Sequence, residues 1–274
     1  MSLLLVVGKQ PVRWSALADG SHTTRRPNAK AGRLAAGGRA RSRYVLSMTS
    51  IPLAEELLLL AYDDQTGKAT GSRIGLDLGM AAAVLIDLAL ASRIAYIDGY
   101  LQVKNTTPTG DPIADAVLTK VAGDPPHTPA QWLQRLRHRL RIRVLEDLCA
   151  RGVVKDVDET QLDYIHVHRY PTTDPAFEAE IRGRLTMALT TENTPDERTA
   201  ALATLLSAAR MEPALKLPAD QVEKAHRRLE AIAAGAGFAG GASMEDSIVR
   251  PSVALVVATL GKAIAAALGA PRVS

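Results

Sequence analysis

The sequence predicts a mainly α-helical fold, a compact single domain of several helices with two short β-hairpins. From Pro52 onward, apolar residues recur with the helical period, and clusters of Gly, Pro and Asp interrupt them at intervals that suit separate helices. Two of the helical segments are each followed by a hairpin pattern. Of the 274 residues, 47% are hydrophobic and 23% are charged, so the chain can bury a sizeable core and wholesale disorder is excluded.

Residues 1–47 are set apart by their charge. They hold nine basic residues and one acid, a net charge of +8, whereas the rest of the chain holds 24 basic and 28 acidic residues, a net charge of −4. The segment is rich in Gly, Ser and Ala without a sustained period, so we expect a disordered basic tail and place the domain at residues 48–274. Its composition also resembles an organellar transit peptide. Met48 offers a simpler explanation, a later start of translation.

The first predicted unit consists of two helices and a hairpin. Leu53–Ala61 is a short helix with two glutamates in its first turn, where carboxylates suit the helix dipole. Asp77–Ser92 is apolar nearly all round, which is typical of a helix at the centre of a domain. Within Arg93–Lys104, the pair Asp98-Gly99 separates two short runs that favour strands, a strong hairpin signal.

A second unit repeats this order. Polar residues before Pro112 can cap a short helix, and Trp132–Ala150 is predicted as a long helix that ends at Arg151-Gly152. Two strands, Val153-Val154 and Leu162–Val167, are expected around a polar tip at residues 156–161.

Three or four helices are predicted after Pro175. They cover Ala176–Thr190, Asp196–Met211, Ala219–Ala234 and about Ser252–Leu268. The last is apolar and rich in alanine, but Gly261 and Lys262 interrupt it, and about 20 strongly apolar residues are needed to span a bilayer. We therefore expect a core helix there and not a membrane span.

Sequence motifs for catalysis are missing, so we predict no enzyme, no cofactor and no catalytic residue. The segment 66–69 resembles a phosphate-binding loop only superficially, because Lys68 is not followed by Ser or Thr. His166 and His168 share one face of a predicted strand, a geometry that metals use, but a third ligand at suitable spacing is missing and we predict no metal site. The single Cys149 excludes a disulfide framework.

Four glycines recur at every fourth position, at residues 67, 71, 75 and 79. Such spacing allows the backbone to approach a ligand closely. Tight packing of a helix that begins in this region explains it equally well.

The segment Trp132–Arg151 is rich in arginine. It holds Arg135, Arg137, Arg139, Arg141, Arg143 and Arg151, together with His138. On a continuous helix, Arg137 and Arg141 project at the edge of the apolar face, whereas the neighbouring arginines point to water. Guanidinium groups at a partly buried edge need anionic partners. These are either the phosphate of a ligand or internal carboxylates such as Asp87 or Glu146.

Several motifs occur in a recognisable order between Pro52 and Leu268. They are LAEELLLL at 53–60, DDQTG at 63–67, VLIDLAL at 84–90 leading into RI at 93–94, PTGD at 108–111, WL at 132–133, LRIRVLEDL at 140–148 and RGVV at 151–154. In this order and spacing the sequence resembles the Golgi phosphoprotein 3 family. The excess of 24 Arg over 9 Lys indicates a GC-rich genome and thus a bacterial member.

The resemblance implies a mainly helical single domain with a projecting β-hairpin that aids oligomerisation or membrane contact. Eukaryotic members of the family are peripheral membrane proteins that bind phosphatidylinositol 4-phosphate on the cytosolic face of the Golgi. They retain glycosyltransferases through the cytosolic tails of those enzymes. The resemblance implies no catalytic activity, and it implies a cytoplasmic protein that sits on the membrane face.

The family's headgroup pocket uses two arginines of the basic helix, and these carry over in part. The second falls on Arg141, and its predecessor falls on His138, or on Arg137 if the alignment slips by one. The family also uses a tryptophan and an arginine near the start of the buried helix. Here the tryptophan falls on Ser72, beside Arg73.

The family's early arginine falls on Ala81, so this chain lacks one guanidinium as well as the aromatic platform. The predicted headgroup-binding residues are Arg141, Arg137, His138, Arg73 and Ser72. Homo-oligomerisation is expected through the hairpin at residues 153–168. Its predicted tip, residues 156–160, is acidic, which makes it a poor membrane wedge and repels anionic lipid.

The leading hypothesis is therefore a non-enzymatic phosphoinositide-binding, adaptor-like domain at the membrane periphery. One alternative is a winged-helix-like module that binds nucleic acid, because such modules also combine helices with hairpins. The net charge of −4 outside the tail argues against it. A second alternative is a protein-interaction scaffold without a ligand, which predicts that internal carboxylates close off both Arg137 and Arg141.

Overall fold

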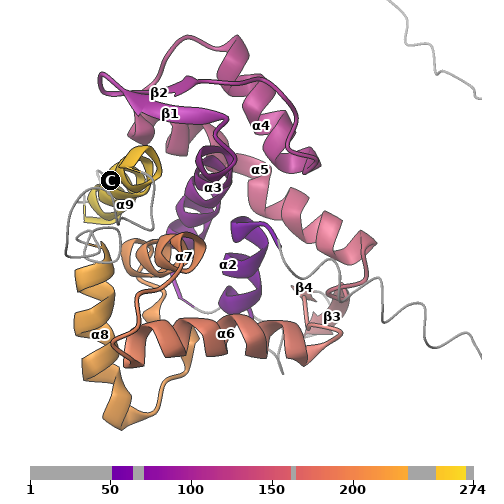
Figure 1. Cartoon of the computed structure of the whole chain (residues 1–274). Coiled ribbons are helices and arrows are strands. Elements are labelled where there is room, and N and C mark those ends of the chain that lie inside the picture. Colours follow the sequence, from indigo (N-terminus) through magenta and orange to yellow (C-terminus); the bar gives the residue numbers. More distant parts are fainter. Residues whose placement is uncertain (1–50, 64–70, 162–164, 234–250, 270–274) are drawn as a thin grey trace, which may run out of the picture. The chain divides into compact units, whose positions relative to one another are not determined.

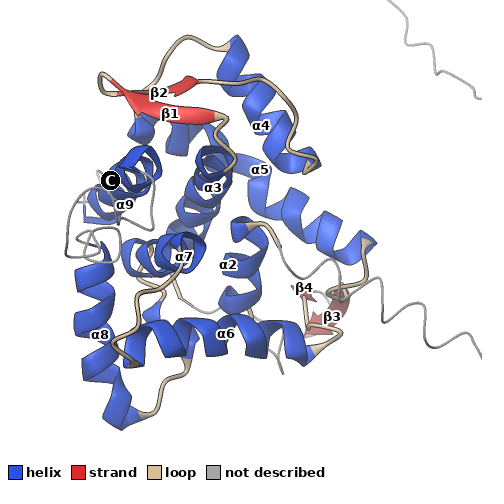
Figure 2. Ribbon diagram, in the orientation of Figure 1, coloured by secondary structure: helices blue, strands red, loops and turns tan. Residues whose placement is uncertain are grey.

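A computed structural model describes residues 51–63, 71–161, 165–233 and 251–269 of the chain (Figure 1). Helices dominate these ranges, with two small antiparallel sheets of two strands each (Figure 2). The prediction of a mainly α-helical fold with two hairpins is confirmed. The predicted tail at residues 1–47 and the loop motif at 66–69 lie outside the described residues.

The described elements follow the predicted order. The helices are α2 (Leu53–Ala61), α3 (Arg73–Leu90), α4 (Pro112–Gly123), α5 (Pro129–Ala150), α6 (Pro175–Thr190), α7 (Glu197–Ala208), the 3-10 helix η2 (Glu212–Leu215), α8 (Ala219–Ala233) and α9 (Pro251–Gly269). The strands are β1 (Ile94–Ile97), β2 (Tyr100–Val103), β3 (Val157–Gln161) and β4 (Ile165–Arg169). β1 pairs with β2 and β3 with β4.

Two helices begin earlier than the apolar pattern indicates, because polar residues cap them. α3 starts at Arg73, since the hydroxyl of Ser72 accepts a hydrogen bond from the backbone N–H of Gly75. α5 starts at Pro129, behind a reciprocal capping box between Thr128 and Gln131.

α3 lies among α2, α5, α7 and α9 and contacts all four (Figure 1). Every residue from Leu78 to Ile86 is buried. This confirms the prediction of a central helix that is apolar on all sides. Residues that project from α3 near its ends are therefore held on a rigid element.

Two of the four regularly spaced glycines serve this packing. A Cβ atom on Gly75 would lie 2.4 Å from the carbonyl oxygen of Ala209, just after α7, and one on Gly79 would lie 2.9 Å from a methyl group of Leu57 in α2. Close helix packing thus explains these two positions. Gly71 has a positive φ of 83° and open space around it, and Gly67 lies outside the described residues.

α9 packs one face into the core. Its buried residues are Val253, Val256, Val257, Leu260 and Ile264, and the helix contacts α3, α5, α7 and β1. Within the described part of the chain, α9 is long and apolar enough to cross a membrane by length and composition, with 33% of the Ser252–Gly269 window buried. One face of α9 thus belongs to the core, and the prediction of a core helix is met for that face alone.

α5 is not the continuous helix that the sequence pattern predicts. His138 has an extended ψ of 128° and Arg139 has a positive φ of 68°, so two helical halves meet there. Arg137 and Arg141 consequently do not lie on successive turns of one helix. The premise of one continuous helix is wrong, so the helical period does not relate the two arginines. The predicted apolar residues on both sides of the break are nevertheless buried, and both arginines are half-buried.

The second hairpin is also shifted from its predicted position. Val153 and Val154 are buried, and Val154 forms an isolated bridge with Thr172. The residues predicted as a polar tip form β3 instead, in which Asp158 pairs with His168. Val153 and Val154 are buried directly after α5, so the hairpin begins only at Val157. Residues 162–164, which belong to the second predicted strand, lie outside the described residues.

Buried ion pairs fix the start of α2. No side chain caps the helix locally, but the backbone N–H of Leu53 donates to a carboxylate oxygen of Asp87 in α3, at 2.8 Å. Arg198 of α7 binds Asp87 at 3.0 Å and Glu56 of α2 at 3.1 Å, and it also donates to the carbonyl of Ile51. These contacts join α2, α3 and α7 at one point.

We predict opposite effects of alanine at two helical glycines. Gly75→Ala places a methyl group against the backbone carbonyl of Ala209, so it should destabilise the fold by about 1–3 kcal/mol. Gly183→Ala is the matched control, because Gly183 lies in α6 with no atom near its added Cβ; it should stabilise by about 0.5–1 kcal/mol. Urea unfolding measures both values. Equal effects would contradict the close packing of α3.

A second prediction concerns Asp87. Burial raises its pKa from 3.8 to about 6, although Arg198 and the N–H of Leu53 oppose this rise. The folded state then binds the proton more tightly than the unfolded state, so ionisation of Asp87 lowers stability as the pH rises from about 4 to about 6. Asp87→Asn keeps an acceptor for Leu53 and removes this loss. The slope of unfolding free energy against pH should therefore be more positive in the variant.

Urea unfolding at several pH values between 4 and 7 measures this slope. Asp98→Asn, in the exposed turn between β1 and β2, is the control and should leave the slope as in the parent chain. Identical slopes for the parent and Asp87→Asn would refute the prediction.

Candidate functional site

Arg141 joins three helical elements. It lies in the second half of α5, and its Nε donates to Oδ1 of Asp77 in α3 at 2.9 Å. Its Nη1 donates to the hydroxyl of Tyr62, the residue that follows α2, at 3.1 Å. The side chains of Arg141 and Asp77 are 16% and 23% exposed. The guanidinium is therefore held in place by both neighbours at the edge of the core.

The guanidinium of Arg141 stays protonated and positively charged. Burial lowers the pKa of its guanidinium, but hydrogen bonds and electrostatic attraction from Tyr62 and Asp77 more than compensate, so the net shift is upward. Among the residues that the structure describes, Nη2 of Arg141 has no hydrogen-bond partner. One end of the guanidinium thus remains available for another acceptor.

The internal partner of Arg141 differs from the carboxylates suggested by the sequence. Asp87 binds Arg198 instead, and the contact with Asp77 spans 64 residues of chain. For Arg141, the expectation of the scaffold hypothesis is met only in part, because an internal carboxylate binds its Nε but does not close off its Nη2.

Arg137 is in a different situation. Its side chain is half-buried, and its Nε is buried without a hydrogen-bond partner among the described residues. The scaffold hypothesis predicted an internal carboxylate here as well, and within that part of the chain none binds Arg137. A buried guanidinium N–H without an acceptor is costly unless water or a ligand satisfies it.

The break between the two arginines places His138 and Arg139 at the surface, both exposed. Arg139 has the left-handed backbone conformation, which is costly for a residue with a side chain. Backbone strain of this kind is frequent at ligand-binding positions.

Ser72 and Arg73 form the exposed start of α3. The Ser72 hydroxyl already accepts the N–H of Gly75. Arg73 lies four residues before Asp77, so the two share one face of α3 on adjacent turns. Ala81 is fully buried one turn farther on, in the core and not at the surface.

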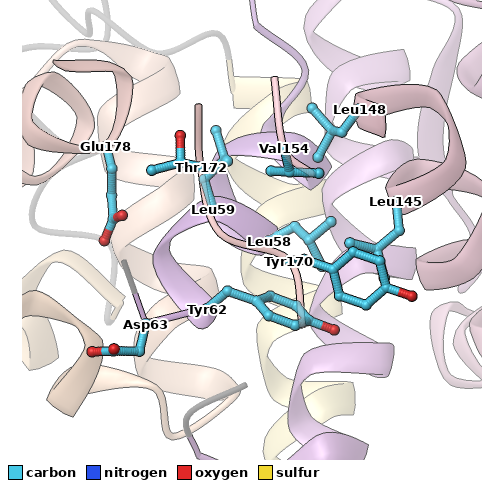
Figure 3. A pocket seen from close by; sticks show the side chains of 10 residues that line it. All are labelled: Leu58, Leu59, Tyr62, Asp63, Leu145, Leu148, Val154, Tyr170, Thr172 and Glu178. Atoms are coloured by element: carbon cyan, nitrogen blue, oxygen red, sulfur yellow. The ribbon is translucent and has the colours of Figure 1, made fainter. Parts of the chain in front are cut away.

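A row of aromatic side chains extends from Arg141. Tyr62 and Tyr170 pack edge to face, with ring centroids 5.6 Å apart, and His168 stacks on Tyr170 at 6.4 Å. Figure 3 shows the two tyrosine hydroxyls on the same side of a small cavity. We call Tyr62, Tyr170 and His168 the aromatic row. Sequence reasoning missed both tyrosines and Asp77, because nothing in the linear pattern marks them as neighbours of Arg141.

The cavity beside the aromatic row is too small for a headgroup. Its volume is about 10 Å³, roughly the space of one water molecule. Its lining residues are Leu58, Leu59, Tyr62, Asp63, Leu145, Leu148, Val154, Tyr170, Thr172 and Glu178. This cavity therefore cannot hold a ligand of Arg141.

His168 pairs with an acidic side chain. Its Nδ1 lies 2.9 Å from a carboxylate oxygen of Asp156, which raises the pKa of His168. The side chain of His166 is not among the described parts of the structure. Within the described residues, no group of three or more His, Cys, Asp or Glu could hold a metal ion.

A larger cleft of about 550 Å³ lies at the start of α2, but its charge does not suit an anion. Four carboxylates line it, from Glu55, Asp87, Asp111 and Asp147. Its two arginines are already bound: Arg151 pairs with Glu55 at 2.6 Å and with Asp147 at 2.7 Å, and Arg198 pairs with Asp87. The Arg141 region is the better candidate for a phosphate.

Comparison with known proteins agrees with this architecture. The family model of Golgi phosphoprotein 3 matches residues 53–260, from the start of α2 into α9. Vacuolar protein sorting-associated protein 74 of Eremothecium gossypii is 24% identical over 167 residues, which cover 53% of this chain and 50% of that relative. The chain thus spans about half the length of this curated relative. Because the family match covers most of the chain, including Tyr62, Asp77 and Arg141, the protein belongs to the Golgi phosphoprotein 3 family.

Proposed function

We propose that this chain is a non-enzymatic, adaptor-like domain that binds the phosphorylated headgroup of a phosphoinositide at a membrane surface. Family membership and the setting of Arg141 support the proposal. The lipid that the family resemblance implies is phosphatidylinositol 4-phosphate. The chain would then act as a peripheral protein on the cytoplasmic face of a membrane, with the β3–β4 hairpin available for self-association.

The observation that carries the proposal is the fixed guanidinium of Arg141. A flexible arginine loses rotamer freedom when it binds a ligand, whereas Asp77 and Tyr62 already hold this one. Its free Nη2 group can donate to a phosphate oxygen, and hydrogen bonds between ionised groups are about twice as strong as neutral ones.

Arg137, His138 and Arg73 are the residues that would add to this contact. Arg137 offers a buried N–H without a described partner, and the other two are exposed around the break in α5 and at the start of α3. Within residues 48–274, attraction must come from such local groups, because this part of the chain carries a net charge of −4.

The pocket differs from the one that the family resemblance implies. Ser72 stands in place of the tryptophan, and buried Ala81 stands in place of the early arginine. The loss of an aromatic surface and a guanidinium weakens binding, so we expect lower affinity than a complete pocket provides.

We predict that Arg141→Ala weakens binding to vesicles of phosphatidylcholine with phosphatidylinositol 4-phosphate by about tenfold or more, as expected for the loss of a charged hydrogen bond. Arg143→Ala removes the same charge from an exposed position two residues away on α5 and should change binding by less than about twofold. Co-sedimentation with vesicles, with and without the phosphoinositide, measures both effects.

Circular dichroism must show that Arg141→Ala remains folded, because the substitution leaves Asp77 without its ion pair. Equal binding by the parent and Arg141→Ala, or binding by neither, would contradict the assignment of the headgroup site.

A further inference from the structure

Asp77 forms an ion pair with Arg141, the residue on which the proposed site depends. Its Oδ1 lies 2.9 Å from Nε of Arg141, and both side chains are mostly buried. We infer that Asp77 is an intramolecular counter-ion, an inference that rests on the proposed function. Asp77 competes with the phosphate of the ligand for Arg141 and thereby sets the affinity of the site for that ligand.

The hydrogen-bonding groups of Arg141 explain the competition. A guanidinium binds a phosphate best through two parallel N–H groups. Asp77 occupies Nε and Tyr62 occupies Nη1, so each two-donor edge of the guanidinium already has one donor engaged. A phosphate must displace one of these partners or accept a weaker contact through Nη2.

The two partners of Arg141 differ in charge. Tyr62 contributes a neutral hydroxyl, whereas Asp77 contributes a carboxylate that repels a phosphate. A like charge at about 6 Å in a partly solvated site weakens binding by roughly tenfold. Asp77 therefore lowers the affinity for a phosphate by charge repulsion, which the neutral hydroxyl of Tyr62 does not.

Asp77 also depends on Arg141. Among the described residues, Arg141 is the cation that contacts this carboxylate. When a phosphate takes over the guanidinium, a carboxylate that is only 23% exposed loses that partner, and part of the binding energy is spent on this loss. The repulsion between Asp77 and the phosphate and the loss of the ion pair of Asp77 both lower the net affinity for an anionic ligand.

The decisive variant is Asp77→Asn. Asparagine keeps an oxygen that can accept from Nε of Arg141, so the guanidinium stays oriented while the negative charge is removed. We expect this variant to bind vesicles containing phosphatidylinositol 4-phosphate about tenfold more tightly than the parent chain. If Asp77 only positions Arg141, binding stays equal or falls.

Three controls separate this effect from a general change in charge. Glu146→Gln removes one negative charge from an exposed position on α5 and should change binding by less than about twofold. Tyr62→Phe removes the neutral partner of Arg141 and should not increase binding about tenfold. Asp77→Asn combined with Arg141→Ala should lose the gain.

The full chain is used for all variants, with co-sedimentation on vesicles of phosphatidylcholine alone, with phosphatidylserine, and with phosphatidylinositol 4-phosphate. Inorganic phosphate as a soluble competitor distinguishes a site for free phosphate from one that needs the lipid. Urea unfolding shows whether each variant is folded.

A gain for Asp77→Asn on the phosphoinositide vesicles that disappears in the double variant supports the inference. The inference alone fails if the parent chain binds through Arg141 but Asp77→Asn binds no more tightly, or if Glu146→Gln gains equally. If no variant binds any of the vesicles, the proposed function fails together with the inference.

Discussion

The ion pairs of Arg198 hold α2, α3 and α7 together, and the candidate site depends on them. Arg198 joins Glu56 of α2 to Asp87 of α3, while Asp87 caps the start of α2 through Leu53. Glu56 is buried and Asp87 is mostly buried. Loss of Arg198 would leave Asp87 without its ion pair, whereas Glu56 would keep its contact with Arg184. Tyr62 follows the far end of α2, and its hydroxyl meets Arg141 only while α2 keeps this position against α3.

The sequence predicts most of the fold because local signals dominate it. The pair Asp98-Gly99 produces the β1–β2 turn, and Asp111 and Pro112 start α4 as expected. Val153-Val154 misled the prediction of the second hairpin, because a short apolar run suits a strand and a buried connection equally well. The break at His138 and Arg139 has no such signal, since neither residue is a helix breaker.

The candidate site was predictable only in part. Arg141 stands out from its position in an arginine-rich helix, but its partner Asp77 lies 64 residues away and Tyr62 lies 79 residues away. Only tertiary packing of α2, α3 and α5 brings these groups together. The basic pI of about 9.3 is equally uninformative, because the charge lies in residues 1–47.

The break in α5 also affects how this chain can be compared with its relatives. Residues 129–137 and 140–150 have separate helical phases, so the face on which a residue lies before the break does not determine the face after it. One residue more or fewer at the break could be absorbed there without moving Arg141 from Asp77. The same change after Leu140 would turn the following residues by about 100° around the helix axis. The residues of a relative that correspond to this chain must therefore be identified separately for the segments before and after His138.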